Sequence, residues 1–214
     1  MLWDMKQDAF HMVASDGHRL AKSKLEIHLP KAMQIIVPRK TILELLRLLK
    51  KPEDYSVELA LTNKQLCVKT PEYTLISRLI EGSFPDYNSF FIPASEVETA
   101  IIDRDLLKDS LSRMNVLLNE RCPGIRLEFS HNSLKLQVYN LEQEEAEEEL
   151  EIEYSPRSLE EKFVIAFNNE YLVQVLDALP YGKIQFTFSS PKNSVLIQHV
   201  SEHKSIYVIM PMRF

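Results

Sequence analysis

The sequence predicts an α+β fold made of two related copies of one domain, with antiparallel sheets and few helices. Three observations support this prediction. Many short segments alternate apolar and polar residues, as strands with one buried face do. Three longer segments repeat apolar residues at the spacing of one helix face. The order helix, strand, strand, strand occurs twice, 129 residues apart, and such an internal repeat indicates two copies of one domain.

The strands are predicted from alternation and from the turn-forming residues between them. Residues 125–130 and 134–139 alternate apolar and polar side chains, and the polar sequence HNS between them is typical of a hairpin turn. The other predicted strands are residues 57–61, 97–102, 184–188 and 195–200.

Helices are predicted over residues 39–51, 104–120 and 169–179. Their apolar residues recur at 42, 45, 46 and 49 in the first, at 107, 111, 114 and 118 in the second, and at 172, 175, 176 and 179 in the third. The first helix has a net charge of +4, because five basic residues accompany Glu44 alone. A basic helix face can follow DNA phosphates without reading bases, although lysine and arginine also simply solubilise many surface helices.

The first copy is incomplete at its start. The second copy begins near Val97 with a strand and a helix, and stepping back by 129 residues places their counterparts about 32 residues before Met1. The repeat therefore predicts that this chain is the later part of a longer protein.

Composition restricts the class of protein. Charged residues make up 26% of the chain, and no apolar run approaches the ~20 residues of a membrane span. Cys67 and Cys122 lie far apart without metal-ligand spacing, which is typical of a reducing compartment, so we expect a cytoplasmic protein with no membrane partner. Residues 141–153 hold eight glutamates and no basic residue, and the rest of the chain has a net charge of +2 rather than −6.

No enzyme, metal or cofactor site is expected. Asp16 and His18 could form an acid–base pair, but no nucleophile or second motif accompanies them. The six histidines form no HExxH motif, and the four glycines form no phosphate-binding loop.

Five separated motifs resemble the bacterial DNA polymerase III beta subunit, the sliding clamp. They are VASDGHRLA, IVPRKTILELLRLL, LIEGSFPDY, YNLEQEEAEEEL and YVIMPMR, in this order across nearly the whole chain. The resemblance implies the DNA clamp fold, in which antiparallel sheets form the outside and two helices per domain line the inner face of a ring. Residues 1–95 would be an incomplete second (middle) domain and residues 96–214 a complete third (C-terminal) domain.

The resemblance also implies what the chain binds. Clamps of this family are replication processivity factors that encircle double-stranded DNA independently of its sequence. They hold the polymerase alpha subunit, the clamp loader, other polymerases and repair proteins, which insert short Gln-Leu-Phe-type peptides into a groove between the last two domains. The DNA-facing residues by motif are Arg39, Lys40, Arg47 and Lys50. The groove residues by motif are Ser15, Gly17, His18, Arg19, Leu20, Pro85, Asn168, Tyr171, Ser194, Val208, Ile209, Met210, Pro211, Met212 and Arg213.

By the same resemblance, Val116 and Leu117 would form the interface at which full-length protomers self-associate into a homodimeric ring. Val116 lies off the apolar stripe of its helix, which agrees with an exposed position. Three residues depart from the family pattern at the groove rim: Asn88, Ser89 and Lys192. The alternative function is a truncated clamp fragment that binds partner peptides without encircling DNA.

Overall fold

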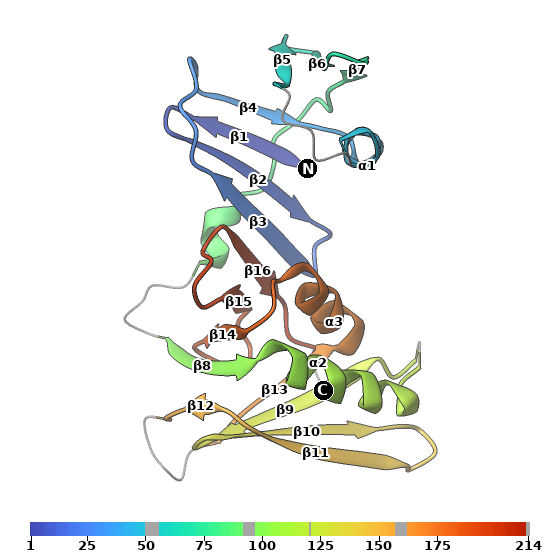
Figure 1. Cartoon of the computed structure of the whole chain (residues 1–214). Coiled ribbons are helices and arrows are strands. Elements are labelled where there is room, and N and C mark those ends of the chain that lie inside the picture. The colour runs from blue at the N-terminus through green and yellow to red at the C-terminus, as the bar shows by residue number, and fades with distance from the viewer. Residues whose placement is uncertain (50–55, 92–96, 120, 157–161, 213–214) are drawn as a thin grey trace. The chain divides into compact units, whose positions relative to one another are not determined.

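The computed structural model describes residues 1–49, 56–91, 97–119, 121–156 and 162–212 (Figure 1). The chain divides into two compact units. Unit 1 comprises Met1–Ser15 and Lys22–Tyr87, and unit 2 comprises Asp16–Ala21 and Asn88–Phe214. The loop that carries the SDGHRL motif therefore belongs mainly to unit 2, although its flanking strands lead into unit 1.

Unit 1 contains two sheets and one α-helix. Its strands and helix are β1 (Leu2–Lys6), β2 (Ala9–Ser15), β3 (Arg19–Leu25), β4 (Met33–Ile36), α1 (Arg39–Leu48), β5 (Glu58–Leu61), β6 (Gln65–Lys69) and β7 (Thr74–Arg78). One sheet has the order β3-β2-β1-β4 and the other β5-β6-β7. The 3₁₀ helix η1 (Tyr87–Phe90) begins at the last residue of unit 1.

A buried carboxylate connects the two ends of unit 1. Asp4 on β1 is 3% exposed and accepts hydrogen bonds from the Tyr87 hydroxyl at 2.8 Å and from the Gln34 amide at 2.9 Å. Burial, followed by the bond to Asp4, raises the pKa of Tyr87 to about 12. Burial by itself would raise the pKa of Asp4, but these donors and nearby Lys6 lower it overall. The pair fixes the end of unit 1 onto its first strand.

Unit 2 contains the other predicted copy and more elements. They are β8 (Glu98–Asp103), α2 (Arg104–Met114), η3 (Asn115–Leu117), β9 (Gly124–Ser130), β10 (Ser133–Tyr139), β11 (Glu145–Glu151), β12 (Glu153–Tyr154), β13 (Phe163–Asn168), α3 (Asn169–Ala178), β14 (Lys183–Phe188), β15 (Val195–His199) and β16 (Ser205–Ile209). Its strands run antiparallel in the orders β12-β8-β14-β15-β16 and β11-β10-β9-β13.

Local sequence explains where the helices of unit 2 begin. The Asp103 carboxylate accepts hydrogen bonds from the main-chain N–H groups of Asp105 and Leu106 at the start of α2. The side chain of Asn168 does the same for Glu170 at the start of α3. Such caps satisfy helix donors that have no partner within the helix. The second helix is shorter than predicted, because the α-helix ends at Met114 and one 3₁₀ turn follows before Leu118 becomes extended.

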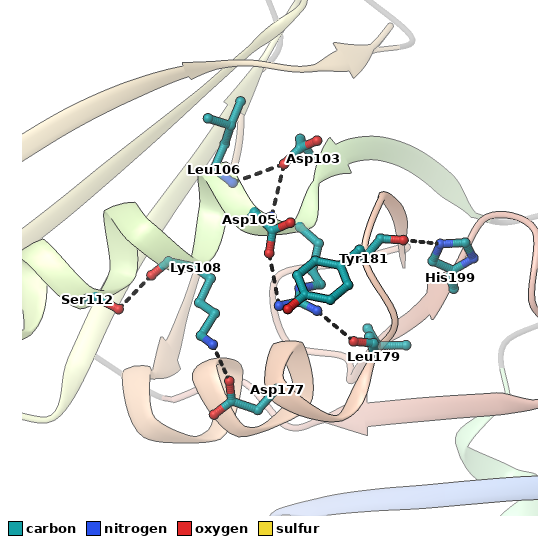
Figure 2. A network of polar contacts seen from close by, with 10 residues as sticks. Asp103, Asp105, Leu106, Lys108, Ser112, Asp177, Leu179, Tyr181 and His199 are labelled. Atoms are coloured by element: carbon teal, nitrogen blue, oxygen red, sulfur yellow. Dashed lines mark hydrogen bonds and ion pairs between the residues drawn. The ribbon is translucent and has the colours of Figure 1, made fainter.

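A buried arginine joins α2 to the end of α3. The Arg104 guanidinium donates to the carbonyl of Leu179 at 2.9 Å, pairs with Asp105 at 2.9 Å and lies 4.5 Å from the ring centroid of Tyr181. Figure 2 shows these partners, together with the ion pair between Lys108 on α2 and Asp177 on α3. The two helices of unit 2 are thus fixed side by side over a common core.

The repeat is visible in the order of the elements. Strands β1, β2, β3 and β4 followed by α1 and β5-β6-β7 correspond to β9, β10, β11 and β13 followed by α3 and β14-β15-β16. Within the described part of unit 1, no element corresponds to β8 or α2. Because these two elements have no counterpart there, one side of α1 is left uncovered. Its four apolar positions were predicted to share one buried face, but Leu46 is 62% exposed and Leu49 is 38% exposed.

Candidate functional site

The turn between β2 and β3 is organised by Asp16. Its carboxylate accepts hydrogen bonds from the main-chain N–H groups of His18 and Arg19 and from Nε of Arg19, each at 3.0 Å. Gly17 has φ +91°, a conformation that suits glycine. Partial burial by itself would raise the pKa of Asp16, but the bonds from His18 and Arg19 lower it overall. Asp16 is therefore a turn-forming acceptor, and its bond to His18 goes to the main chain rather than to the imidazole.

Tyr171 on α3 contacts two side chains of this turn. The Arg19 guanidinium lies 4.3 Å from the centre of the tyrosine ring, within cation–π range. The His18 ring stacks on the same tyrosine, with centroids 6.3 Å apart and planes 29° apart. His18 and Arg19 of the SDGHRL motif and Tyr171, a predicted groove residue about 150 positions later, thus form one cluster within unit 2.

The C-terminal tail adjoins this turn through the main chain. The N–H of Met210 donates to the carbonyl of His18 at 2.9 Å. Two residues later the N–H of Met212 donates to the carbonyl of Ala166 on β13 at 2.8 Å. The Met212 sulfur lies 3.5 Å from the point that a β-carbon on Gly124 would occupy. Residues 210–212 therefore leave the sheet of β16 and approach the edge strand of the other sheet.

Beside the tail is a pocket of about 1090 Å³. Met210, Pro211 and Met212 line it together with Ala166 and Lys192. Its remaining lining residues come from β9, β10, β13 and the turn before β15: Gly124, Arg126, Gln137, Tyr139, Val164, Ile165 and Pro191. The walls are mostly apolar, and two basic side chains contribute to them. Such a pocket suits an extended apolar peptide with some acidic or polar groups.

The other predicted groove residues differ in their environment. Val208 and Ile209 are 1% and 0% exposed, so their side chains lie in the core. Leu20 is also buried, and Asn168 caps α3. Ser194 is half-buried, Ser15 and Pro85 are exposed residues of unit 1, and Arg213 lies outside the described residues.

The residues predicted to face DNA lie on α1 or just beyond it. Arg39 and Lys40 are exposed at its first turn. Arg47 is exposed at its last turn and pairs with Glu44 at 3.0 Å, so part of its charge is neutralised within the helix. Lys50 lies outside the described residues.

The predicted ring-interface pair divides between surface and core. Val116 is 83% exposed, whereas Leu117 is half-buried and packs against the core of unit 2. Together with Leu118 and the exposed Leu141 they line a pocket of about 630 Å³. The glutamate-rich segment forms β11, an edge strand, where Glu147 pairs with Lys135 at 2.5 Å and Glu148 pairs with Arg113.

Sequence analysis missed three contributors to the site. Asp16 could have been recognised, since Asp-Gly in a turn signals a side chain that accepts main-chain hydrogen bonds. The carbonyl of Ala166 and the side chain of Tyr139 carry no such signal, because only the pairing of strands places them beside the tail. Among the residues that the structure describes, no group of three metal-ligating side chains occurs, and no helix is long and apolar enough to cross a membrane.

Two family models match the chain. The central domain of the DNA polymerase III beta subunit matches residues 1–86, and the C-terminal domain of the same subunit matches residues 90–213. The beta sliding clamp of Pseudomonas aeruginosa is 40% identical over 215 residues, and that of Escherichia coli K12 is 35% identical. In both cases the match covers 100% of this chain and 57% of the relative.

Solved structures of sliding clamps also match this chain over nearly its whole length. A crystal structure of the DNA polymerase III subunit beta from Pseudomonas aeruginosa matches with a TM-score of 0.93 and 39% identity, over 100% of this chain and 58% of that one. A sliding clamp from the same organism bound to griselimycin matches with a TM-score of 0.93 and 38% identity, over 100% and 57% of the two chains. The clamp of Caulobacter crescentus matches with a TM-score of 0.87 and 30% identity, over 96% and 54%. The chain thus spans somewhat more than half the length of these relatives.

Proposed function

This chain belongs to the DNA polymerase III beta subunit family, the bacterial sliding clamps, and we propose that it recruits partner proteins to DNA through the groove built from its SDGHRL turn and its C-terminal tail. One observation supports this most directly. The turn, Tyr171 and the tail meet within unit 2 through the ring contacts of His18 and Arg19 and the hydrogen bond from Met210 to His18.

The chemistry of the groove suits short peptides rich in Gln, Leu and Phe. Methionine side chains adapt to several apolar partners, and Pro211 limits the flexibility of the tail between Met210 and Met212. Exposed Met210 and the neighbouring pocket offer apolar surface whose burial gives affinity. Arg19 is held in place by Asp16 and Tyr171 and could donate to a peptide carbonyl or to the glutamine. The partners would be the polymerase alpha subunit, the clamp loader, other polymerases and repair proteins.

We further propose that residues 1–95 are an incomplete middle domain and residues 96–214 a complete last domain of such a clamp. In a closed ring, Arg39 and Lys40 would face duplex DNA, while Val116 and Leu117 would contact the neighbouring protomer. An acidic outer edge such as β11 and a basic inner helix would let a ring slide, since phosphates attract it without base contacts that hold it at one site. The second candidate function is peptide binding without encirclement, since the proposed groove lies within unit 2 and needs no second chain.

Titration of a fluorescent Gln-Leu-Phe-type peptide with the full chain tests the groove. We expect saturable binding that is lost when residues 211–214 are deleted, because the deletion removes Pro211 and Met212 from the pocket wall. Thermal unfolding should change little, since the deleted residues lie beyond β16 and the structure gives Met212 one main-chain hydrogen bond. Unchanged peptide affinity in the deletion variant would refute the assignment.

A second measurement separates the two candidate functions. Retention on circular duplex DNA, compared with the same DNA after linearisation, reports topological linkage. A ring slides off free ends and is lost on linearisation, whereas a peptide-binding module shows equal and weak retention on both. The molecular mass in solution should also be measured over a range of protein concentrations, because encirclement requires assembly of more than one chain.

A further inference from the structure

A row of side chains on the sheet β11-β10-β9-β13 leads to the C-terminal tail (Figure 1). One face of this sheet packs in the core through residues such as Ile125, which is 0% exposed. On the other face, Gln137 lies opposite Arg126, and Arg126 lies opposite Ala166. The carbonyl of Ala166 accepts the hydrogen bond from Met212 of the tail. The row therefore forms one wall of the pocket beside the tail.

Arg126 is only weakly paired within the chain. Its guanidinium lies 3.9 Å from the Glu128 carboxylate, which pairs more closely with Lys162 at 2.6 Å. Among the described residues, nothing accepts a hydrogen bond from the buried Nε of Arg126, and its side chain is 41% exposed. A guanidinium presents five N–H donors in a fixed fork that fits a carboxylate. Arg126 thus retains donors for a ligand in the pocket.

A second basic side chain reaches the same pocket from the turn between β14 and β15. Lys192 is exposed and lines the pocket. Hydrogen bonds within the turn hold its main chain, because the N–H of Lys192 donates to the Ser190 hydroxyl at 3.4 Å and that of Asn193 donates to the Ser190 carbonyl at 3.0 Å. Within the described ranges, no carboxylate pairs with the Lys192 ammonium. Its charge is therefore also open to a ligand.

The pocket is a local basic surface on an acidic protein. The net charge of the chain is −6, and five of the seven residues of the edge strand β11 are glutamates. Among the described residues that line the pocket, two are basic and none is acidic. The nearby Glu147 of β11 is already engaged by Lys135 at 2.5 Å and by Gln137 at 2.9 Å. A single carboxylate suits this surface, whereas a long polyanion such as nucleic acid would also meet the repulsion of β11.

The tail connects the SDGHRL turn to this pocket. Its Met210 N–H donates to the carbonyl of His18 in the turn, and its Met212 N–H donates to the carbonyl of Ala166 in the pocket wall. A peptide that binds along the tail would therefore reach the pocket with the residues on one side of its Gln-Leu-Phe segment. Tyr139, which is 52% exposed in the pocket, offers an aromatic surface to those residues.

We propose that Arg126 and Lys192 bind a carboxylate side chain of the partner peptide, so that this chain prefers peptides with Asp or Glu beside the Gln-Leu-Phe segment. The acidic side chain lies in the pocket between the two cations, and its neighbour packs on Tyr139. This inference rests on the proposed peptide groove and adds the chemical class of the flanking residues that the groove selects.

Three fluorescent peptides of equal length test the preference. All contain the same Gln-Leu-Phe-type segment. One carries two glutamates before it, one carries two glutamates after it, and the neutral peptide has glutamines at both places. Fluorescence anisotropy with the full chain should show one of the two acidic peptides binding about fivefold tighter than the neutral peptide, as partly exposed charge pairs allow. The gain should shrink at high salt, because salt screens exposed charges.

Variants of the two basic residues identify the source of the gain, measured as the ratio of the acidic to the neutral affinity. Lys192→Gln and Arg126→Gln should each bring this ratio close to one, and Arg126→Lys should retain part of it. Lys192→Glu should reverse the ratio, so that the neutral peptide binds more tightly. The matched control is Lys204→Gln, because Lys204 is an exposed lysine in the turn at the other end of β15 and does not line the pocket.

The outcomes separate this site from the groove itself. If none of the three peptides binds, the groove is refuted and the carboxylate site with it. If the neutral peptide binds and neither acidic peptide gains, only the carboxylate site is refuted. Equal gains for both acidic peptides, or equal effects of Lys192→Gln and Lys204→Gln, would show general charge attraction and also refute the site. A single-stranded oligonucleotide that displaces the favoured peptide from the unaltered chain but not from Lys192→Glu would identify phosphate as the ligand and overturn the assignment.

Discussion

The Arg19 guanidinium lies 4.3 Å from the ring centroid of Tyr171, while its Nε donates to the Asp16 carboxylate at 3.0 Å. The arginine is thus held by an aromatic ring of one helix and by a carboxylate of its own turn. Because both contacts restrict its rotamers before a ligand arrives, less conformational entropy would be lost on binding of a peptide to the proposed groove. Tyr171, Asp16 and Tyr87 all make contacts of this kind.

Tyr171→Ala should weaken binding of a Gln-Leu-Phe-type peptide by roughly 30-fold, equivalent to about 2 kcal/mol, because it removes the ring that positions both His18 and Arg19. Tyr171→Phe retains the ring and should change the affinity less than about threefold, since cation–π and stacking contacts need no hydroxyl. Isothermal titration measures both variants. Equal losses for alanine and phenylalanine would show that the ring contacts are not what matters.

Asp16→Ala should disorder the turn, because it removes the acceptor of three hydrogen bonds. Loss of a side-chain acceptor of this kind costs about 1–2 kcal/mol of stability, and peptide affinity should fall in parallel. Asp16→Asn retains an acceptor oxygen for the main chain and should be milder. The lowered pKa of Asp16 implies that the turn persists at neutral pH and weakens only in acid, below about pH 4. Peptide binding that is unaffected by Asp16→Ala would contradict this role.

Tyr87→Phe should destabilise unit 1 by about 1–3 kcal/mol, because buried Asp4 then retains Gln34 as its side-chain donor and loses the phenol. The pKa of Tyr87 is raised to about 12, so ionisation of the unfolded chain above about pH 10 reduces the stability of the native protein. In Tyr87→Phe this alkaline loss should shrink. Trp3, the single tryptophan, is buried in unit 1 and reports its unfolding directly.

Acid should destabilise unit 1 in two steps. Burial, followed by the positive charges of Lys22 and Lys6, lowers the pKa of His11, so the unfolded chain binds a proton more readily than the native one. Stability should therefore fall as pH drops below about 6.5, and again below about 4 as Asp4 protonates. His11→Gln should remove the first step and leave the second. Urea unfolding followed by Trp3 fluorescence from pH 8 to pH 3.5 resolves them, and a flat profile between pH 7 and pH 5 would exclude a role for His11.

Charge reversal of Arg39 and Lys40 should weaken binding to duplex DNA at low salt without changing peptide affinity. Both side chains are exposed at the first turn of α1 and contact phosphates in the proposed ring. The slope of log affinity against log salt should fall by roughly two in the double glutamine variant, about 0.9 for each lost phosphate contact. For the charge reversal Arg39→Glu with Lys40→Glu, the control with the same change of net charge is Lys31→Glu with Lys69→Glu. An equal loss in the control would indicate a general charge effect.

Much of the fold could be predicted because its signals are local. Strand alternation, the caps at Asp103 and Asn168 and the repeated order of elements depend on residues that are close in sequence. The same is true of the motifs from which the groove residues were selected. The contacts between the groove residues, however, could not be predicted from local signals. Nothing in the sequence near Tyr171 indicates that its ring contacts Arg19, and nothing near Ala166 indicates that its carbonyl accepts from Met212.

The clearest difference between what the sequence predicts and what the structure shows concerns α1. By itself the sequence determined that α1 is an amphipathic helix, since Leu45, Leu46 and Leu49 recur at helical spacing just as Val175, Leu176 and Leu179 do in α3. Only the tertiary structure decided that the second set is core and most of the first is surface. Periodicity fixes which side chains share a face, whereas burial requires another element to cover that face. In unit 2, α2 and β8 cover it, and the described part of unit 1 has no counterpart to them.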